Sequence, residues 1–335
     1  MDKTDFFQQL AEAVGAGESE NIRNIFANLV NEDEARALLA AAPPATVDEI
    51  SEKTAIGAED VEKMIPSLFA RGLIFKSSKK DGPQKYYRVR HVPQLHDSTA
   101  VNPDVPAEVL KLWKDFMENE WSDYSLKMDS MLPGAVVRVL PIDEKIEPES
   151  RIMAPDDVRK AVENAANLAV TKCSCRVIDG SCGKPLEVCI QLDRAADYAV
   201  ERGTGRRITA AEAVEILDTC RQEGLVHVAD NRHPVGHVIC NCCDDCCMNW
   251  TAMRAGAEKW VVPSRFAAVV DQELCEECET CMESCFFDAI VMVDGPARVD
   301  PDTCMGCGVC AVSCPSGAIS LKEIRPADFI PQQAK

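Results

Sequence analysis

The sequence has no cysteine in its first 172 residues, although the 335-residue chain contains 18 cysteines. It also lacks any uncharged apolar stretch of the ~18 residues that a membrane-spanning helix needs, so we expect no membrane span. Residues 1–10 show no basic segment followed by an apolar run and a cleavage site. This argues against a secretory signal, and we expect a cytoplasmic location.

Basic residues are few relative to acidic ones. The chain has 36 Lys and Arg against 55 Asp and Glu, a formal net charge of −19. General nucleic-acid binding requires clustered cations that displace counterions from phosphate, so DNA is an improbable partner. The negative charge instead favours docking on basic faces of protein partners.

The cysteines indicate metal or cluster binding rather than disulfide bonding. A disulfide framework is typical of small exported domains, whereas this chain is large and shows no export signal. Its cysteines include adjacent pairs and CxxC spacings, which make poor disulfide frameworks and good ligand sets. All 18 lie between residues 173 and 314.

The first quarter of the chain has a pattern of two helices and a hairpin. Residues 45–54 and 58–71 have helical patterns, with Gly72 ending the second. Residues 73–76 and 86–89 then read as strands around a polar turn at 79–82. This order resembles a winged-helix domain, which we place at residues 1–92. Acidic residues in the would-be recognition helix oppose DNA and favour protein docking or a structural role: Glu59, Asp60 and Glu62.

Composition divides the rest of the chain. Residues 93–135 read as a linker and a helix, because residues 91–106 are rich in Pro, Asn and Asp and an apolar helical pattern follows. A cysteine-rich domain covers 136–262, a second cysteine-rich module 263–325, and a tail 326–335. We expect a strand at 136–140 and helices at 155–172, 185–202 and 210–223, the last with Thr209 as its N-cap.

The module at 263–325 contains the sequence CxxCxxCxxxC twice, with Pro315 behind the second copy. Four thiolates are needed for a 4Fe–4S cluster, and the fourth cysteine of each copy reaches the cluster of the other copy. One predicted ligand set is therefore Cys275, Cys278, Cys281 and Cys314. The other is Cys304, Cys307, Cys310 and Cys285.

The two copies also repeat beyond their cysteines, since residues 286–290 match 315–319. Over about sixty residues this module resembles the bacterial two-cluster ferredoxins, with a pseudo-twofold βαβ-βαβ fold, although Phe286 stands where that family usually has proline. Two zinc sites are the alternative, because CxxC also suits zinc. Tandem eight-cysteine spacing favours two 4Fe–4S clusters.

The middle domain holds nine further candidate ligands in two bunches: Cys173, Cys175, Cys182, Cys189, Cys240, Cys242, Cys243, Cys246 and Cys247. Two more clusters would use eight of them, and one cluster with spare thiols is a simpler alternative. Zinc is also possible. We favour at least one further 4Fe–4S cluster, with ligands that spacing alone does not identify. Cys220, on a helix face, is expected to be a buried apolar residue.

These features together predict an α+β multidomain protein: a winged-helix-like N-terminal domain, a helical cysteine-rich middle domain and a C-terminal dicluster ferredoxin. The whole resembles large ferredoxin-like proteins of anaerobic bacteria that carry CxCR and CNCC segments. That resemblance implies an electron-transfer subunit, more than a stand-alone enzyme, which exchanges single electrons with protein redox partners and can form oligomers. Two alternatives stay open: an oxidoreductase with a catalytic middle-domain cluster, and a redox-sensing regulator that uses the winged helix.

Overall fold

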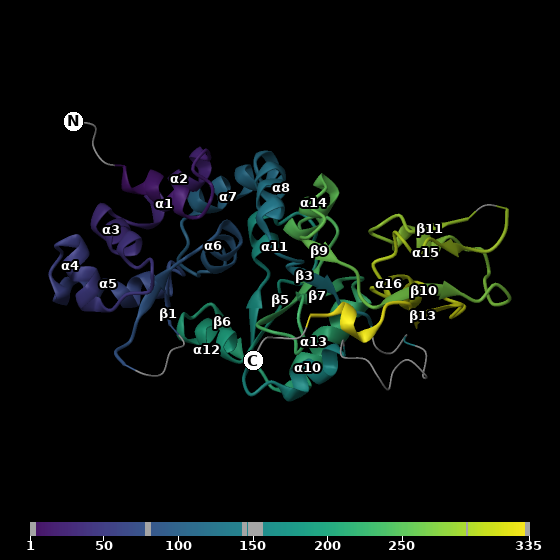
Figure 1. Ribbon diagram of the computed structural model, residues 1–335. Helices are drawn as coiled ribbons and strands as arrows, with labels where there is room; N and C mark the ends of the chain where they lie inside the picture. The colour runs from purple at the N-terminus through teal and green to yellow at the C-terminus, as the bar shows by residue number, and fades with distance from the viewer. Residues whose placement is uncertain (1–4, 78–81, 143–145, 147–156, 293, 332–335) are drawn as a thin grey trace. The chain divides into compact units, whose positions relative to one another are not determined.

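The computed structural model describes residues 5–77, 82–142, 146, 157–292 and 294–331, and the chain divides into two compact units (Figure 1). The first unit comprises Met1–Tyr124, Ser174–Gly180 and Val200–Thr204. The second comprises Ser125–Cys173, Ser181–Ala199 and Gly205–Lys335. No helix among the described residues combines the length and apolar character that crossing a bilayer requires.

The first unit is mainly helical. Its elements are α1 (Phe6–Ala13), α2 (Glu20–Leu29), α3 (Glu32–Ala40), α4 (Val47–Thr54), α5 (Ala58–Ala70), β1 (Ile74–Lys76), β2 (Tyr86–Arg88), α6 (Val92–Thr99), α7 (Ala107–Asn119) and α11 (Ser174–Asp179). α8 (Trp121–Met131) begins in this unit. Three aromatic side chains of α7 and α8 are buried at its core: Trp113, Phe116 and Trp121.

The predicted succession of two helices and a hairpin is confirmed at α4, α5, β1 and β2. α4 begins at a capping box, in which Thr46 accepts from the Glu49 N–H and the Glu49 carboxylate accepts from the Thr46 N–H. Gly72 follows α5 with φ +78°, and β1 pairs antiparallel with β2. Most of the predicted turn at 79–82 lies outside the described residues.

Residues 91–106 are not simply a linker, which corrects the sequence expectation. α6 begins behind His91, whose Nδ1 accepts from the Gln94 N–H at 3.2 Å, and Val92 and Leu95 are fully buried. Pro93 lies in the first turn, where a missing N–H leaves no helical bond unmade. Pro and Asp near a helix start resemble loop composition, so composition alone misassigned the segment.

The second unit is built on a seven-stranded sheet with the order β6-β4-β5-β8-β7-β3-β9. All of its neighbouring strands are antiparallel except β3 and β9. The strands are β3 (Val137–Val139), β4 (Leu168–Lys172), β5 (Glu187–Leu192), β6 (Gly205–Arg207), β7 (Val226–Asp230), β8 (Val238–Cys242) and β9 (Val261–Val262). The accompanying helices are α10 (Val158–Asn164), α12 (Arg194–Glu201), α13 (Ala210–Gln222) and α14 (Met248–Ala255).

The expectation of a helical middle domain is therefore wrong. The segment 185–202 forms β5 and then α12, and 155–172 forms α10 and then β4, with residues 155 and 156 outside the described part. In β5 the alternate residues Val188, Ile190 and Leu192 are buried. Apolar residues four apart fit both one face of a helix and one face of a strand. This segment forms a strand because β4 and β8 pair with it on either side.

One face of this sheet is covered by α10 and α13. Val158 and Val162 of α10 and Leu217 of α13 pack with Ile190 and Ile239, which face each other across β5 and β8. The predicted helix at 210–223 is confirmed, with the Thr209 hydroxyl accepting from the Glu212 N–H at 3.1 Å.

The C-terminal part of this unit has two small antiparallel sheets beside two short helices (Figure 1). β10 (Phe266–Val270) pairs with β13 (Ile319–Glu323), and β11 (Ile290–Val291) pairs with β12 (Arg298–Val299). The helices are α15 (Thr280–Glu283) and α16 (Val309–Ser313), and a 3-10 turn (Ala327–Phe329) follows. Helices and sheets thus occur together, in a mixed α/β chain.

Candidate functional site

Two cysteine-lined cavities lie in the C-terminal part, and each draws its thiols from both CxxCxxCxxxC copies. Cavity 1 is lined by Cys275, Cys278, Cys281 and Cys314. Cavity 2 is lined by Cys285, Cys304, Cys307 and Cys310. The structure thus brings together the same two groups of four cysteines that the sequence predicts as ligand sets.

The ligand loops of the two cavities share an unusual backbone. Glu277 and Glu279 have φ of 56° and 63°, and the corresponding residues Gly306 and Gly308 have φ of 65° and 88°. Left-handed backbone is disfavoured for residues with a Cβ, by roughly 1–2 kcal/mol. Both loops therefore adopt one wrapping geometry, which the first loop achieves with glutamates and the second with glycines.

Crowding explains why only the second loop needs glycine. A Cβ on Gly306 would overlap the Phe266 carbonyl oxygen and the Ser264 hydroxyl, and one on Gly308 would lie 3.0 Å from Leu321 Cδ1. Glu277 and Glu279 are exposed, so their side chains extend into solvent. The sequence indicated the two glycines but not that the glutamates occupy equivalent left-handed positions.

The two cavities differ in exposure. Cavity 1 has the exposed thiol Cys278 and is lined by Glu276 and Glu279. Cavity 2 lies against the rest of the second unit: the Ile142 N–H donates to the Cys307 carbonyl at 3.0 Å. Phe287, which lines cavity 2, packs edge-on against Trp250 of α14, with ring centroids 5.2 Å apart. Cavity 1 is therefore the solvent-facing member of the pair.

The thiols of cavity 2 need a positive charge to ionise together. Burial, reinforced by the neighbouring Cys304 and Cys285 sulfurs, raises the pKa of the Cys307 thiol to about 12. Burial and the sulfurs around it likewise raise the pKa of Cys310. Protein thiolates this close repel one another in a poorly solvated site, and bound metal cations remove that penalty.

In cavity 1 the pKa is shifted in opposite directions at two thiols, Cys281 and Cys314. Burial and the neighbouring sulfurs raise the pKa of Cys281. At Cys314, burial opposes ionisation, but hydrogen bonds from the Ser316 hydroxyl and nearby backbone N–H groups outweigh it and lower the pKa. Ser316 as a partner of the fourth thiol was not recognised from the sequence, although it stands two residues after that cysteine.

These features fit a 4Fe–4S cluster in each cavity. Each has four thiols from two chain segments, which is the ligand number that such a cluster requires. Backbone donors also approach the sulfurs, as the Ala268 N–H does to Cys304 Sγ at 3.5 Å. When bound, the clusters would supply one-electron redox chemistry, while the chain sets their spacing, exposure and hydrogen bonding.

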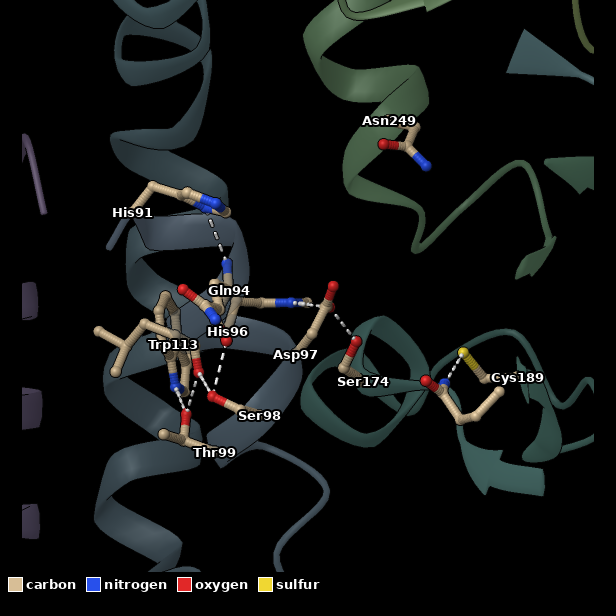
Figure 2. Close-up of polar contacts among 12 residues, drawn as sticks. His91, Gln94, His96, Asp97, Ser98, Thr99, Trp113, Ser174, Cys189 and Asn249 are labelled. Carbon is tan, nitrogen blue, oxygen red and sulfur yellow. Dashed lines mark hydrogen bonds and ion pairs between the residues drawn. The ribbon is translucent and has the colours of Figure 1, made fainter. Parts of the chain in front are cut away.

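The nine middle-region cysteines do not form the two bunches seen in the sequence. Cys175 lies on α11 and belongs to the first unit, whereas the other eight belong to the second. Figure 2 shows how α11 is held within its unit: the Ser174 hydroxyl donates to Asp97 of α6 at 2.7 Å, and Asp97 also contacts His96 Nδ1 at 2.8 Å. Lys114 of α7 binds Asp179 at 3.1 Å.

Three of the remaining thiols lie on one face of the sheet. Cys189 is on β5, and Cys240 and Cys242 are on the adjacent strand β8. Side chains alternate between the two faces of a sheet along each strand. These cysteines therefore lie on the face of the sheet away from Ile190 and Ile239, whose side chains pack against α13. Cys189 accepts a hydrogen bond from the Gln191 amide at 3.2 Å (Figure 2). We refer to Cys189, Cys240 and Cys242 as the sheet-face thiols.

Four others lie at one end of the sheet. The sulfurs of Cys182, Cys243 and Cys246 are all within 4.8 Å of one another, and Cys173 packs against the same apolar cluster. We refer to Cys173, Cys182, Cys243 and Cys246 as the sheet-end thiols. Cys247 is the residue before α14 and is buried. Cys220 is fully buried in α13, as predicted.

Comparison with known protein families agrees with the C-terminal assignment. The family described as 4Fe-4S binding domain matches residues 268–291 and 297–320, one match for each cysteine repeat. None of the curated proteins compared with the chain matches it. The C-terminal region is therefore a tandem 4Fe–4S binding region. For the remainder of the chain, the site assignments depend on the structure alone.

Proposed function

We propose that this protein is an iron–sulfur electron-transfer protein or subunit that relays single electrons between protein redox partners. The observation that carries the proposal is the pair of four-cysteine cavities, each made from both halves of the tandem 4Fe–4S region. Among the described residues no His or Asp lines either cavity, and the thiols offer four ligand positions in each. A fully ligated cluster transfers electrons and offers no iron to a substrate.

The exposure of the two cavities suggests a direction for the relay. Cavity 1 opens among exposed carboxylates, where a partner can approach: Asp271, Glu273, Glu276, Glu277 and Glu279. Cavity 2 contacts residues of the cysteine-rich sheet domain through Ile142 and Trp250. Cavity 1 is the docking end for a basic protein, and cavity 2 connects to the centre in the middle domain.

A further 4Fe–4S cluster is part of the proposal, with the sheet-face thiols as three of the four ligands that such a cluster needs. Directly opposed residues on adjacent strands, and residues two apart on one strand, have Cβ atoms roughly 4.5–7 Å apart. That spacing suits thiolates that each bind a separate iron. In the first unit, α4, α5 and the hairpin serve protein docking, because Glu59, Asp60 and Glu62 are exposed on α5 and would repel DNA.

Anaerobic purification followed by iron and sulfide analysis tests the proposal. We expect about twelve iron per chain, four from each of three clusters, and reversible reduction seen by EPR in dithionite. About eight iron would remove the sheet-face cluster and leave the two-cluster relay. Fewer than about four iron, or clusters that dithionite cannot reduce, would contradict the electron-transfer proposal itself.

The docking end can be tested by reversing its charge. With a basic acceptor such as cytochrome c as the probe, the double variant Glu276→Lys, Glu279→Lys is expected to slow electron transfer by about tenfold at low ionic strength. The difference should shrink as salt screens the charges. Stopped-flow reduction of the acceptor measures both effects.

The matched control carries the same charge change at the start of α2, as Glu18→Lys, Glu20→Lys, outside the helices and hairpin assigned to protein docking. Both residues are exposed and lie in the first unit. We expect this variant to reduce the acceptor at the wild-type rate. Equal slowing by both variants would mean that net charge, rather than the carboxylates at cavity 1, governs the rate.

A further inference from the structure

The sheet-end thiols come from three separate segments of the chain. Cys173 follows β4, Cys182 precedes β5, and Cys243 and Cys246 follow β8. The fold brings them together because β4, β5 and β8 are consecutive strands of the sheet.

The spacing of these sulfurs differs from that in the ferredoxin cavities. Around one tetrahedral ion with metal–sulfur bonds of ~2.3 Å, the thiolates lie about 3.8 Å apart. In a 4Fe–4S cluster each thiolate binds its own iron, so the sulfurs lie farther apart. Cys182, Cys243 and Cys246 meet a 4.8 Å limit, which no trio of ferredoxin thiols among the described residues does. The sheet-end site is thus sized for one ion.

We propose that the four sheet-end thiols bind a single tetrahedral Zn²⁺ ion. Each thiol loses its proton as its zinc–sulfur bond forms, and no electron is transferred. Four thiolates in a tetrahedron are a ligand set that zinc favours over hard cations. This site is separate from both ferredoxin cavities and from the sheet-face thiols, and it does not depend on the electron-transfer proposal.

Cys173 supplies the fourth ligand rather than Cys220. Cys173, Cys182 and Cys246 are partly buried cysteines that pack against the same apolar cluster. The Cys173 N–H donates to the Leu186 carbonyl at 2.8 Å, which fixes it beside the segment that enters β5. Cys220 lies in the fully buried part of the cluster, against Val188 and Leu225.

The ion would join the loop before β5 to the turn after β8. That turn, at residues 243–247, has no helix or strand of its own and leads directly into α14. α14 carries Trp250, which packs on Phe287 of cavity 2. Zinc has no redox chemistry, so its role is to hold this turn, and through α14 the wall of the neighbouring cavity.

Metal analysis of the full chain tests the proposal. The holoprotein, purified anaerobically from cells supplied with both metals, is expected to hold about one zinc per chain besides its iron. Cys182→Ser and Cys173→Ser should each lower zinc by about tenfold with iron unchanged. Cys220→Ser is the matched control and should keep the zinc, because Cys220 is packed among apolar side chains.

Four outcomes would overturn the proposal. Wild-type protein without zinc would do so, and so would a loss of about four iron in Cys182→Ser, which would mark a cluster site. If Cys173→Ser kept its zinc and Cys220→Ser lost it, the fourth ligand would be Cys220 and the proposed ligand set would be wrong. Because a serine variant can misfold, wild-type protein from cobalt-supplied cells gives a second readout: an intense thiolate-to-cobalt spectrum of a tetrahedral site is expected, and its absence would count against the site.

Discussion

Gly306→Ala is expected to remove the cluster of cavity 2, so that iron falls by about four per chain. Gly306 has φ +65°, and an added Cβ would collide with the Phe266 carbonyl and the Ser264 hydroxyl. Phe266 begins β10, which is paired with β13, so this backbone cannot shift freely. Iron and sulfide analysis, with EPR of the reduced protein, measures the loss.

The first ligand loop provides a matched control at the corresponding position. Glu277 has φ 56° but is exposed, so Glu277→Ala keeps the same backbone strain without any clash. This variant should retain the iron of cavity 1. If Gly306→Ala also kept its full iron content, steric crowding would not be the reason for glycine at 306.

Cys285→Ala is expected to expose the thiols of the other cysteine repeat rather than those of its own. Cys285 lines cavity 2 together with Cys304, Cys307 and Cys310. Loss of the fourth thiolate should leave those three open to alkylation and remove about four iron. Mass spectrometry after maleimide labelling identifies which cysteines react, and Cys275, Cys278 and Cys281 should stay protected.

The reciprocal variant and a buried control complete this experiment. Cys314→Ala should expose the thiols of cavity 1 and leave those of cavity 2 protected, because Cys314 lines cavity 1. Cys220→Ala should expose neither set, since Cys220 is packed among apolar side chains. Labelling of Cys275, Cys278 and Cys281 in Cys285→Ala would show that each repeat binds its cluster alone.

Local sequence was sufficient wherever a short segment carried its own signal. The predicted capping residue Thr209 marks the start of α13, because its hydroxyl accepts from the N–H three residues on. The CxxCxxCxxxC repeats likewise predicted the region that the 4Fe-4S binding domain family matches. In these cases the interacting groups are near neighbours in the chain.

Local sequence failed where distant strands decide the structure. Residues 185–202 contain Leu186 and Ile190 at helical spacing, yet β5 forms because β4 and β8 pair on both of its sides. The Pro, Asn and Asp content of 91–106 suggested a linker, but α6 buries Val92 and Leu95 within the first unit. The segments that pair with β5 or cover α6 are distant in the sequence, so a window of a few residues does not contain them.

The sequence by itself determined the tandem 4Fe–4S region and the abundance of middle-region thiols. Only the tertiary structure decided how those thiols are grouped. Cys242 and Cys243 are adjacent in the chain. Cys242, at the end of β8, is one of the sheet-face thiols, whereas Cys243 is one of the sheet-end thiols. The physical reason is that side chains alternate across a strand and the turn after β8 then redirects the chain, so neighbours in sequence reach different sites.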